Sequence, residues 1–360
     1  MVVTHSESWR MRDLQYSHRS GRRSRLVVVS WLTPVLALVT FALLLATGHR
    51  GRAHAEEAAS PDPPDILTTA TPPLPRHALT QQLPSGNLIL GYPGDKTFTG
   101  TVRIRVEGVG TFTVTAAEVE SFRPDLFTPG RFSAFDATIA ALERAGIPVE
   151  YTFDPKLDTH IIMSIAGIPG PWWYKAHYDG GGFEENAYRM DYYAVKEKTE
   201  IQLYRLDAPR FQHLVDSFRV EVDRRRSNEG KVIIPVVYIQ GPSWKQEFHD
   251  VEVRSFALRP DTLRPGVITA ADVLLSLAEQ GKITLDAEWV ETIGNVIVRG
   301  YYFTRINQDK QAGRAGWIYE TGSNLFRGQR LNLIHVTTDL RILHSPDYLL
   351  LRWADLGRDP

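Results

Sequence analysis

The chain has 360 residues, which is long enough for two ordinary domains and a leader segment. Its 41 basic and 42 acidic side chains leave a formal net charge of -1, so no global field attracts polyanions, and we exclude nucleic acid as a partner. There is no cysteine, which excludes disulfides, thiolate metal sites and thiol nucleophiles.

The N-terminal segment predicts transfer out of the cytoplasm. Residues 1–25 are rich in arginine and are expected to stay inside, whereas residues 26–48 form an uncharged run long enough to cross a hydrocarbon core of about 30 Å as a helix. The pattern Ala53-His54-Ala55 is one that a signal peptidase could cleave. The run is therefore either a membrane anchor, with the bulk of the chain outside the cell membrane, or a signal peptide whose cleavage after Ala55 gives a secreted protein.

A proline-rich linker follows the hydrophobic run. Residues 49–96 combine many prolines with small and polar residues and have few large apolar side chains before Leu88. Such a segment cannot bury enough surface to offset its ordering entropy, and we expect an extended, solvated stalk.

The remaining chain contains an internal repeat. Residues 119–146 and 253–281 share Arg-Pro-Asp, Pro-Gly, an alanine, an aspartate and a glutamate in register, after an insertion of two residues in the second copy. We place the repeat units at residues 97–208 and 215–354. The second unit has a longer insertion at residues 322–335, whose role is open.

Each unit is expected to contain one helix and several strands, which makes the fold class α+β. Ser133 and Asp136, like Thr269 and Asp272, have the spacing of a helix capping box, and a glycine follows the last turn of both helices. Alternating apolar residues predict strands on either side of each helix. The main expected strands are residues 101–107, 111–115, 149–153 and 199–204 in the first unit and 218–222, 232–239, 283–289 and 348–353 in the second.

These elements resemble the extracellular β-grasp family, which includes the C-terminal domain of transcobalamin and intrinsic factor and many uncharacterised bacterial surface proteins. In the first unit the resemblance rests on the helix, on Ile165-Ala166-Gly167, on Trp173-Tyr174 and on the strand near Ile201. The second unit keeps the helix, Ile306-Asn307, Trp317-Ile318-Tyr319 and the last strand. The resemblance implies two tandem β-grasp-like domains of the ββαβ type.

The resemblance also supplies one small-molecule candidate, a corrinoid. In the cobalamin carriers this small domain acts as a lid, while a large helical barrel forms much of the remaining site. No such barrel is present in this sequence, so the resemblance implies the fold more strongly than the ligand. No other cofactor is predicted.

Trp173 and Tyr174 are the first candidate binding residues. In a strand, Trp173 points away from the face that Trp172 and Tyr174 share. Trp172 and Tyr174 are expected to be core residues, because Trp317 and Tyr319 repeat them, whereas Trp173 corresponds to Ile318. Trp173 is therefore the predicted ligand contact.

His177 and Asp179, with Glu184 and Glu185 nearby, flank a triple glycine and are further candidates for a ligand site. Their donor atoms suit a metal ion or a sugar hydroxyl, but their spacing matches no metal signature, and we predict no metal site. The alternative interpretation is a solvated hairpin tip.

No catalytic motif is present, so the chain is not predicted to be an enzyme. We find no nucleophile elbow, phosphate loop, zinc-protease motif or dinucleotide fingerprint. The acidic pairs Asp154 with Asp158 and Glu184 with Asp191 would support acid–base chemistry only if they met in a cleft.

The sequence therefore favours a membrane-tethered or secreted binding module for a small molecule, a glycan or a cell-surface protein. The alternative is a structural or accessory subunit of a membrane complex that uses exposed edge strands for pairing. An extracytoplasmic hydrolase is the third and weakest hypothesis.

Overall fold

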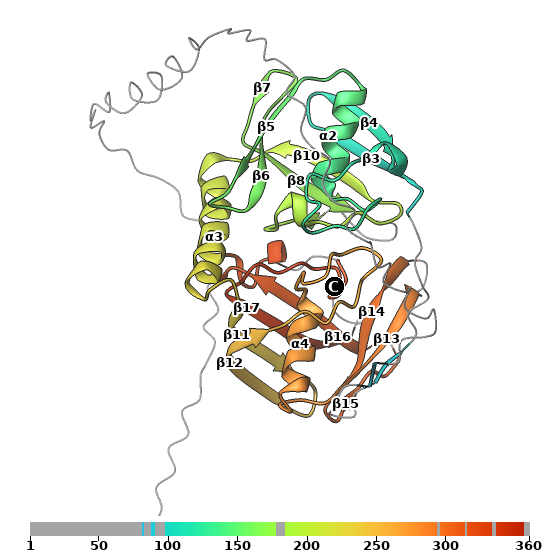
Figure 1. Cartoon of the computed structure of the whole chain (residues 1–360), viewed down its shortest axis with the longest axis vertical. Coiled ribbons are helices and arrows are strands. Elements are labelled where there is room, and N and C mark those ends of the chain that lie inside the picture. The colour runs from blue at the N-terminus through green and yellow to red at the C-terminus, as the bar shows by residue number, and fades with distance from the viewer. Residues whose placement is uncertain are drawn as a thin grey trace, which may run out of the picture. The chain divides into compact units, whose positions relative to one another are not determined.

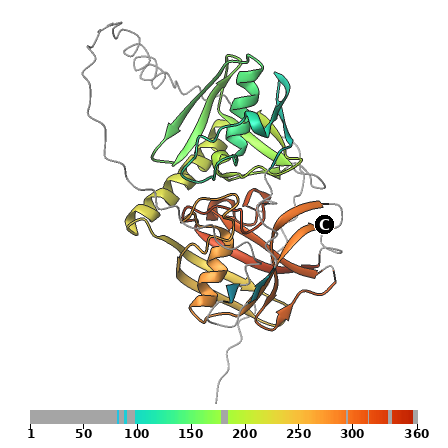
Figure 2. The same cartoon turned by 45° about the vertical axis from the view of Figure 1, so that its right-hand side comes forward.

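The computed structural model describes residues 81–82, 88–90, 98–177, 184–293, 296–313, 315–332 and 336–355. This part of the chain is a mixed α/β structure with three α-helices and several sheets (Figures 1 and 2). The basic segment, the hydrophobic run at residues 26–48 and most of the expected linker lie outside the described residues. None of the helices that the structure describes is long and apolar enough to span a membrane.

The first half contains a five-stranded sheet with one helix. Its sheet has the order β4-β3-β10-β8-β9, in which β3 and β10 are parallel neighbours, and a second sheet has the order β5-β6-β7. The elements are β3 (Thr101–Val106), β4 (Gly110–Thr115), η1 (Ala116–Glu118), α2 (Ala134–Arg144), β5 (Val149–Asp154), β6 (Thr159–Ile165), β7 (Ile168–Pro169), β8 (Trp172–His177), β9 (Glu184–Glu185), η2 (Met190–Tyr192) and β10 (Glu200–Arg205).

The second half repeats this arrangement. Its main sheet has the order β12-β11-β17-β16, and β11 is parallel to β17 as β3 is to β10. A second sheet has the order β1-β2-β13-β14-β15. The elements are β11 (Val232–Gln240), β12 (Lys245–Val253), α4 (Ala270–Glu279), β13 (Leu285–Ile293), β14 (Val296–Ile306), β15 (Asp309–Lys310), β16 (Ala315–Gly322), η3 (Asn324–Phe326), η4 (Arg330–Asn332) and β17 (Tyr348–Asp355), joined by β1 (Gln81–Gln82) and β2 (Leu88–Leu90).

The two predicted helices are confirmed, together with their capping boxes. At the start of α2 the backbone N–H of Ser133 donates to the carboxylate of Asp136 at 2.7 Å, and the N–H of Asp136 donates to the Ser133 hydroxyl at 3.2 Å. At α4 the N–H of Thr269 likewise donates to the carboxylate of Asp272 at 2.7 Å, whereas the N–H of Asp272 donates to the backbone oxygen of Thr269 at 3.1 Å. These bonds satisfy amides that have no partner within the helix, which is why both helices begin where the repeat predicts.

One expected strand is wrong. Residues 218–222 belong to α3 (Ala208–Ser227), and the opening hairpin of the second half is formed by β11 and β12 instead. Asp207 caps α3 by accepting a hydrogen bond from the N–H of Arg210 at 3.0 Å. Leu214, Phe218 and Val222 are buried at a spacing of four residues, which is a helical period. Over five residues alone, an apolar residue at every second position had suggested a strand.

The linker also differs from expectation at one place. Leu88–Leu90 is not simply a solvated segment, because it forms β2 and pairs in parallel with residues 286–288 of β13. The short cyan strands beside β13 mark this segment in Figure 1. The chain before the first unit therefore completes a sheet in the second half.

Candidate functional site: the repeat junction and the hairpin edge

Trp173 lies in β8 and is 6% exposed. Its Nε1 donates to the backbone oxygen of Asn186 at 2.6 Å, and its ring lies 6.1 Å and 6.0 Å from the rings of Phe211 and Phe218 in α3. The open contact surface expected around Trp173 is absent from the described residues, because α3 covers that face of the sheet. A ligand would reach this ring only by displacing the helix.

The other predicted site residues do not form a site in the described part of the chain. Tyr174 is fully buried and donates its hydroxyl to the backbone oxygen of Tyr188 at 2.8 Å, as expected for a core residue. His177 is partly buried at the end of β8, and Asp179 lies outside the described residues. Within those residues, no three His, Asp or Glu side chains are grouped as metal ligands would be.

The repeated Arg-Pro-Asp motif builds a buried ion-pair cluster in each half. Arg123 donates from Nε and Nη2 to the carboxylate of Asp125, at 2.9 and 2.7 Å. Its Nη1 donates to the buried carboxylate of Asp191 at 3.3 Å and to the backbone oxygen of Asp158 at 3.2 Å. Its Nη2 also lies 3.2 Å from the carboxylate of Asp158. Every nitrogen of this guanidinium therefore donates to an acceptor.

Arg259 repeats these contacts in the second half. It donates to Asp261 at 2.8 and 2.9 Å, to the buried carboxylate of Asp339 at 3.1 Å, and to the backbone oxygen of Arg299 at 3.2 Å. Burial alone would lower the pKa of Arg259, but the charges of Asp339 and Asp261 outweigh burial and raise that pKa. Since both arginines are satisfied by internal acceptors, the two clusters are structural.

The two copies of the motif also bind each other. Phe127 and Leu263 form an antiparallel bridge between the halves. On either side of it, the N–H of Thr128 donates to the oxygen of Thr262 at 3.0 Å, and the N–H of Arg264 donates to the oxygen of Leu126 at 2.9 Å. The repeat units are thus joined through equivalent backbone segments.

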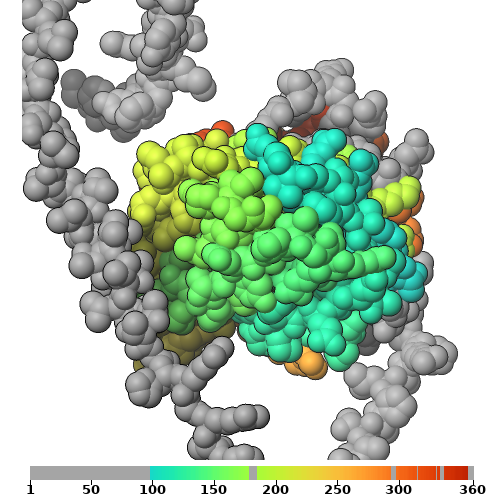
Figure 3. Space-filling model, turned by 90° about the horizontal axis from the view of Figure 1, so that it is seen from above, coloured from blue at the N-terminus to red at the C-terminus, as the bar shows by residue number. Residues whose placement is uncertain are grey.

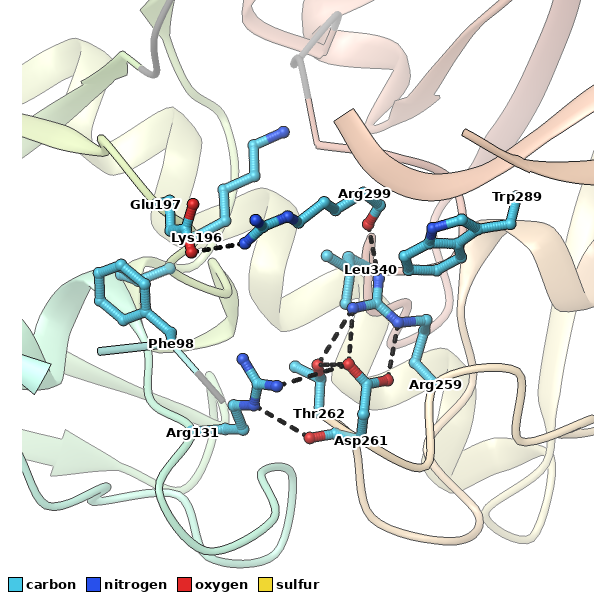
Figure 4. Close-up of a pocket in the computed structure, with 11 residues that line it drawn as sticks. Phe98, Arg131, Lys196, Glu197, Arg259, Asp261, Thr262, Trp289, Arg299 and Leu340 are labelled. Atoms are coloured by element: carbon cyan, nitrogen blue, oxygen red, sulfur yellow. Dashed lines mark hydrogen bonds and ion pairs between the residues drawn. The ribbon is translucent and has the colours of Figure 1, made fainter. Parts of the chain in front are cut away.

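A pocket lies beside each ion-pair cluster. The pocket beside Arg259 has a volume of about 40 Å³ and is lined by Arg131, Lys196 and Glu197 as well as Arg299 (Figure 4). The pocket beside Arg123 has a volume of about 260 Å³. Both are smaller than the roughly 300–1,000 Å³ of typical small-molecule sites, and a corrinoid is far larger than either.

The charges around the smaller pocket are balanced. Arg299 pairs with Glu197 at 2.5 Å and with Glu291 at 3.3 Å, and Arg131 donates to the backbone oxygen of Asp261 at 3.0 Å. Burial is the main reason that the pKa of Lys196 is lowered to about 8; the charge of Asp339 opposes this shift and that of Arg259 adds to it. The pocket is therefore a polar seam between the halves rather than a cationic site for an anion.

Asp158 and His344 connect the two halves beside the larger pocket. The Asp158 carboxylate accepts a hydrogen bond from the Tyr192 hydroxyl at 2.7 Å and lies 3.1 Å from Nε2 of His344. Burial lowers the pKa of His344. Burial would raise the pKa of Asp158, but the hydrogen bond with His344 and the charge of Arg123 outweigh it and lower that pKa. Asp158 and Asp191 do converge, yet they meet on Arg123 and not in a catalytic cleft.

Exposed apolar side chains lie on and beside the β5–β6 hairpin. Phe122 is 39% exposed, Phe153 is 43% exposed and Met163 is 52% exposed, so three of the five exposed large hydrophobic side chains in the described residues lie on or beside this hairpin. Phe122 packs edge-to-face on Tyr151 at 5.4 Å, and Phe153 lies 5.0 Å from the ring of His160. Figure 3 looks onto this half, where green residues from the hairpin region lie at the surface.

Sequence reasoning detected part of this arrangement. It found the Arg-Pro-Asp motif because the motif is repeated in register, but it gave the motif no role. It gave no sign of the contact between Asp158 and His344, since nothing in the local pattern of either residue points to the other. The exposed hairpin was predicted as a strand without a surface role.

Comparison of the chain with family models, with curated proteins and with solved structures found no match in any of the three. Its function is therefore argued from its own residues.

Proposed function

We propose that the chain is an extracytoplasmic binding module, and not an enzyme, that recognises another protein through its β5–β6 hairpin. We call Phe122, Phe153, Met163 and the outer edge of β5 the hairpin surface. The uncharged run at residues 26–48 supports a membrane anchor or a signal peptide, so the module would work outside the cell membrane, tethered or secreted.

The observation that carries this proposal is that two exposed rings, those of Phe122 and Phe153, lie together against His160, at 5.7 and 5.0 Å, with exposed Met163 on the same hairpin. Scattered single apolar residues are ordinary on a protein surface, but a cluster is typical of an interaction site. The junction pockets support the same choice, because they are small and the arginines beside them, Arg123 and Arg259, are held by carboxylates of the same half. At the repeat junction, therefore, neither pocket is of the size of a typical small-molecule site, and the exposed hairpin favours a protein partner.

We also propose that each half is a β-grasp-like unit. The order of elements in both halves supports this assignment, because a hairpin is followed by a helix and the last strand lies parallel to the first strand. An accessory subunit of a membrane complex and a surface receptor would both use such a module. Stable co-purification of the partner favours the accessory subunit.

The test is affinity capture of the full chain from its native membranes in mild detergent. The double variant Phe122→Ser, Phe153→Ser is expected to lose the captured partner. A matched control is Val220→Ser, Leu325→Ser, which removes two exposed apolar side chains from other parts of the surface. Circular dichroism checks that both variants fold.

Retention of the same partner by the hairpin double variant would contradict the proposed surface. Failure of the unmodified chain to capture any partner would contradict the protein-binding function. A coloured or other small-molecule ligand bound to the purified chain would favour small-molecule binding over protein binding.

A further inference from the structure

The second half shows how its hairpin is completed by an added strand. Leu88, Ile89 and Leu90 of β2 lie in parallel register with Asp286–Glu288 of β13, with Ile89 opposite Ala287. This segment precedes the first repeat unit, so it is not part of the repeat. It occupies the outer edge of the hairpin formed by β13 and β14.

The β5–β6 hairpin has the same backbone pairing as the β13–β14 hairpin. Val149 pairs with Ile165 as Leu285 pairs with Ile306. The register shift between Glu150 and Tyr151 recurs between Asp286 and Ala287. Residues 150–152 therefore hold the positions that residues 286–288 hold in the second half.

The backbone groups at this edge point in the same direction in both hairpins. The N–H of His160 donates to Asp191 at 3.0 Å, and the N–H of Tyr301 donates to Asp339 at 3.2 Å, so neither amide points at its partner strand. In an antiparallel pair, the residues opposite them also direct their amides outward. These opposite residues are Phe153 and Trp289. Tyr151 and Ala287 lie two residues before them, so their amides also point outward.

The outer edge of β5 is open where that of β13 is covered. Among the described residues no strand lies beyond β5, and Glu150 and Thr152 are exposed. The described residues include one added segment, Leu88–Leu90, for two equivalent edges, and that segment is already paired with β13. A second segment for the edge of β5 is not found among the described residues.

We propose that β5 accepts a short extended segment of the partner protein, which pairs in parallel at residues 150–152 as β2 pairs with β13. This inference rests on the proposed protein-binding function and defines the chemistry of the partner. The middle residue of the segment lies on the face of Tyr151, beside the exposed ring of Phe153, and is apolar.

The residue of the segment beside Glu150 is basic. In the second half the equivalent carboxylate, Asp286, is neutralised by Arg305 at 2.7 Å. The residue opposite Glu150 on β6 is Ser164, which has no charge. The Glu150 carboxylate has no ion-pair partner among the described residues, so it is available to a basic side chain of the incoming strand.

The first probe is a fluorescent peptide with the sequence of residues 86–92, titrated into the full chain in mild detergent. A second peptide carries Leu88→Lys, which places a basic residue beside Glu150. Both peptides are expected to bind. The Leu88→Lys peptide is expected to bind about two- to fivefold more tightly, which is the gain in affinity that an exposed ion pair gives. Glu150→Lys is expected to reverse that preference, whereas Glu247→Lys, on the edge strand β12, is expected to leave it unchanged.

A modified probe tests the backbone pairing without altering the protein. In a parallel ladder, the outward groups of one residue bond to the residues on either side of its partner, so the amide of residue 90 would donate to Tyr151 while the amide of residue 89 points away. N-methylation of the peptide at residue 90 is expected to weaken binding about tenfold. N-methylation at residue 89 is the matched control and is expected to have little effect.

Equal binding of the two N-methylated peptides, or a charge preference that Glu150→Lys does not change, would overturn strand addition at β5. A dimer in which the Leu88–Leu90 segment of one copy cross-links to β5 of the other would also overturn it, because the occupant would then be a second copy. Capture of a partner that depends on Phe122 and Phe153, without peptide binding, would leave the proposed function standing and remove only this inference. Peptide binding without any captured partner would contradict the proposed function instead.

Discussion

Asp158 and His344 are 186 residues apart in the sequence, yet Nε2 of His344 lies 3.1 Å from the Asp158 carboxylate, so one side chain from each half meets at the repeat junction. Burial lowers the pKa of His344, which keeps the imidazole neutral in the folded chain. The contact is therefore a hydrogen bond between a neutral histidine and an ionised aspartate near neutral pH.

This contact predicts a loss of stability in mild acid. As the pH falls through about 6.5, the unfolded chain protonates His344 before the folded chain does, so the contribution of His344 to the free energy of unfolding decreases by up to about 1.4 kcal/mol per pH unit. His344→Gln is expected to flatten this dependence between pH 7 and pH 5, measured by urea unfolding. The lowered pKa of Asp158 adds a separate loss only below about pH 4. The same slope in the variant and the unmodified chain would contradict the assignment.

The ion-pair cluster of the second half predicts a large cost for removing its arginine. Arg259→Met leaves the buried carboxylate of Asp339 without its cation, and we expect a loss of about 3–5 kcal/mol in the free energy of unfolding. Arg219→Met is the matched control, because Arg219 forms an exposed ion pair with Asp216 and its loss is expected to cost less than about 1 kcal/mol. Adding Asp339→Leu to Arg259→Met is expected to recover part of the loss. Equal costs for the two single variants would show that the cluster does not stabilise the junction.

The capping box of α4 predicts an unusual titration. Burial raises the pKa of Asp272 to about 6, against the hydrogen bonds that its carboxylate accepts from the N–H groups of Phe256 and Thr269. Because the folded chain takes up this proton before the unfolded chain does, Asp272 contributes increasing stability as the pH falls from 7 towards 4. NMR titration of the carboxyl carbon is expected to give a midpoint near 6, and a midpoint below 4 would contradict the burial argument.

The same capping box predicts the effect of a neutral replacement. Asp272→Asn has one acceptor oxygen in place of two, so it leaves a buried N–H of the capping box unpaired and is expected to cost about 1–3 kcal/mol. Glu279→Gln, at the exposed end of α4, is the control and is expected to cost less than about 1 kcal/mol. A cost as small as that of the control would show that the second oxygen is not needed.

The helices of the repeat could be predicted because their signals are local. A hydroxyl residue followed three positions later by an aspartate, as at Ser133 and Asp136, satisfies helix amides whatever the rest of the chain does. The repetition of this spacing in the second half made the prediction firmer. Local chemistry and tertiary packing agree at these positions.

The two principal errors have one physical origin. The alternation at residues 218–222 predicts a strand, and without a helix at these residues the face of Trp173 is predicted to be a binding surface. In the structure Phe218 and Phe211 of α3 pack on Trp173. The orientation of Trp173 along its strand was inferred from the pleat, but its burial depends on a helix far along the chain, which a short window cannot reveal.

The hairpin edges yield the last prediction, because equivalent amides on them have different surroundings. The outward amide of Ala287 faces β2, whereas that of Tyr151 faces no described strand. Amide exchange measured by NMR on the full chain is therefore expected to be faster at Tyr151 than at Ala287. Leu90→Pro removes the amide of β2 that would donate to Ala287, and it is expected to raise exchange at Ala287 about tenfold, towards the rate at Tyr151. The amide of Glu288, which faces β14, is the internal control and is expected to keep its protection. Unchanged exchange at Ala287 would mean that β2 does not protect this edge, and β13 would then be no precedent for strand addition at β5.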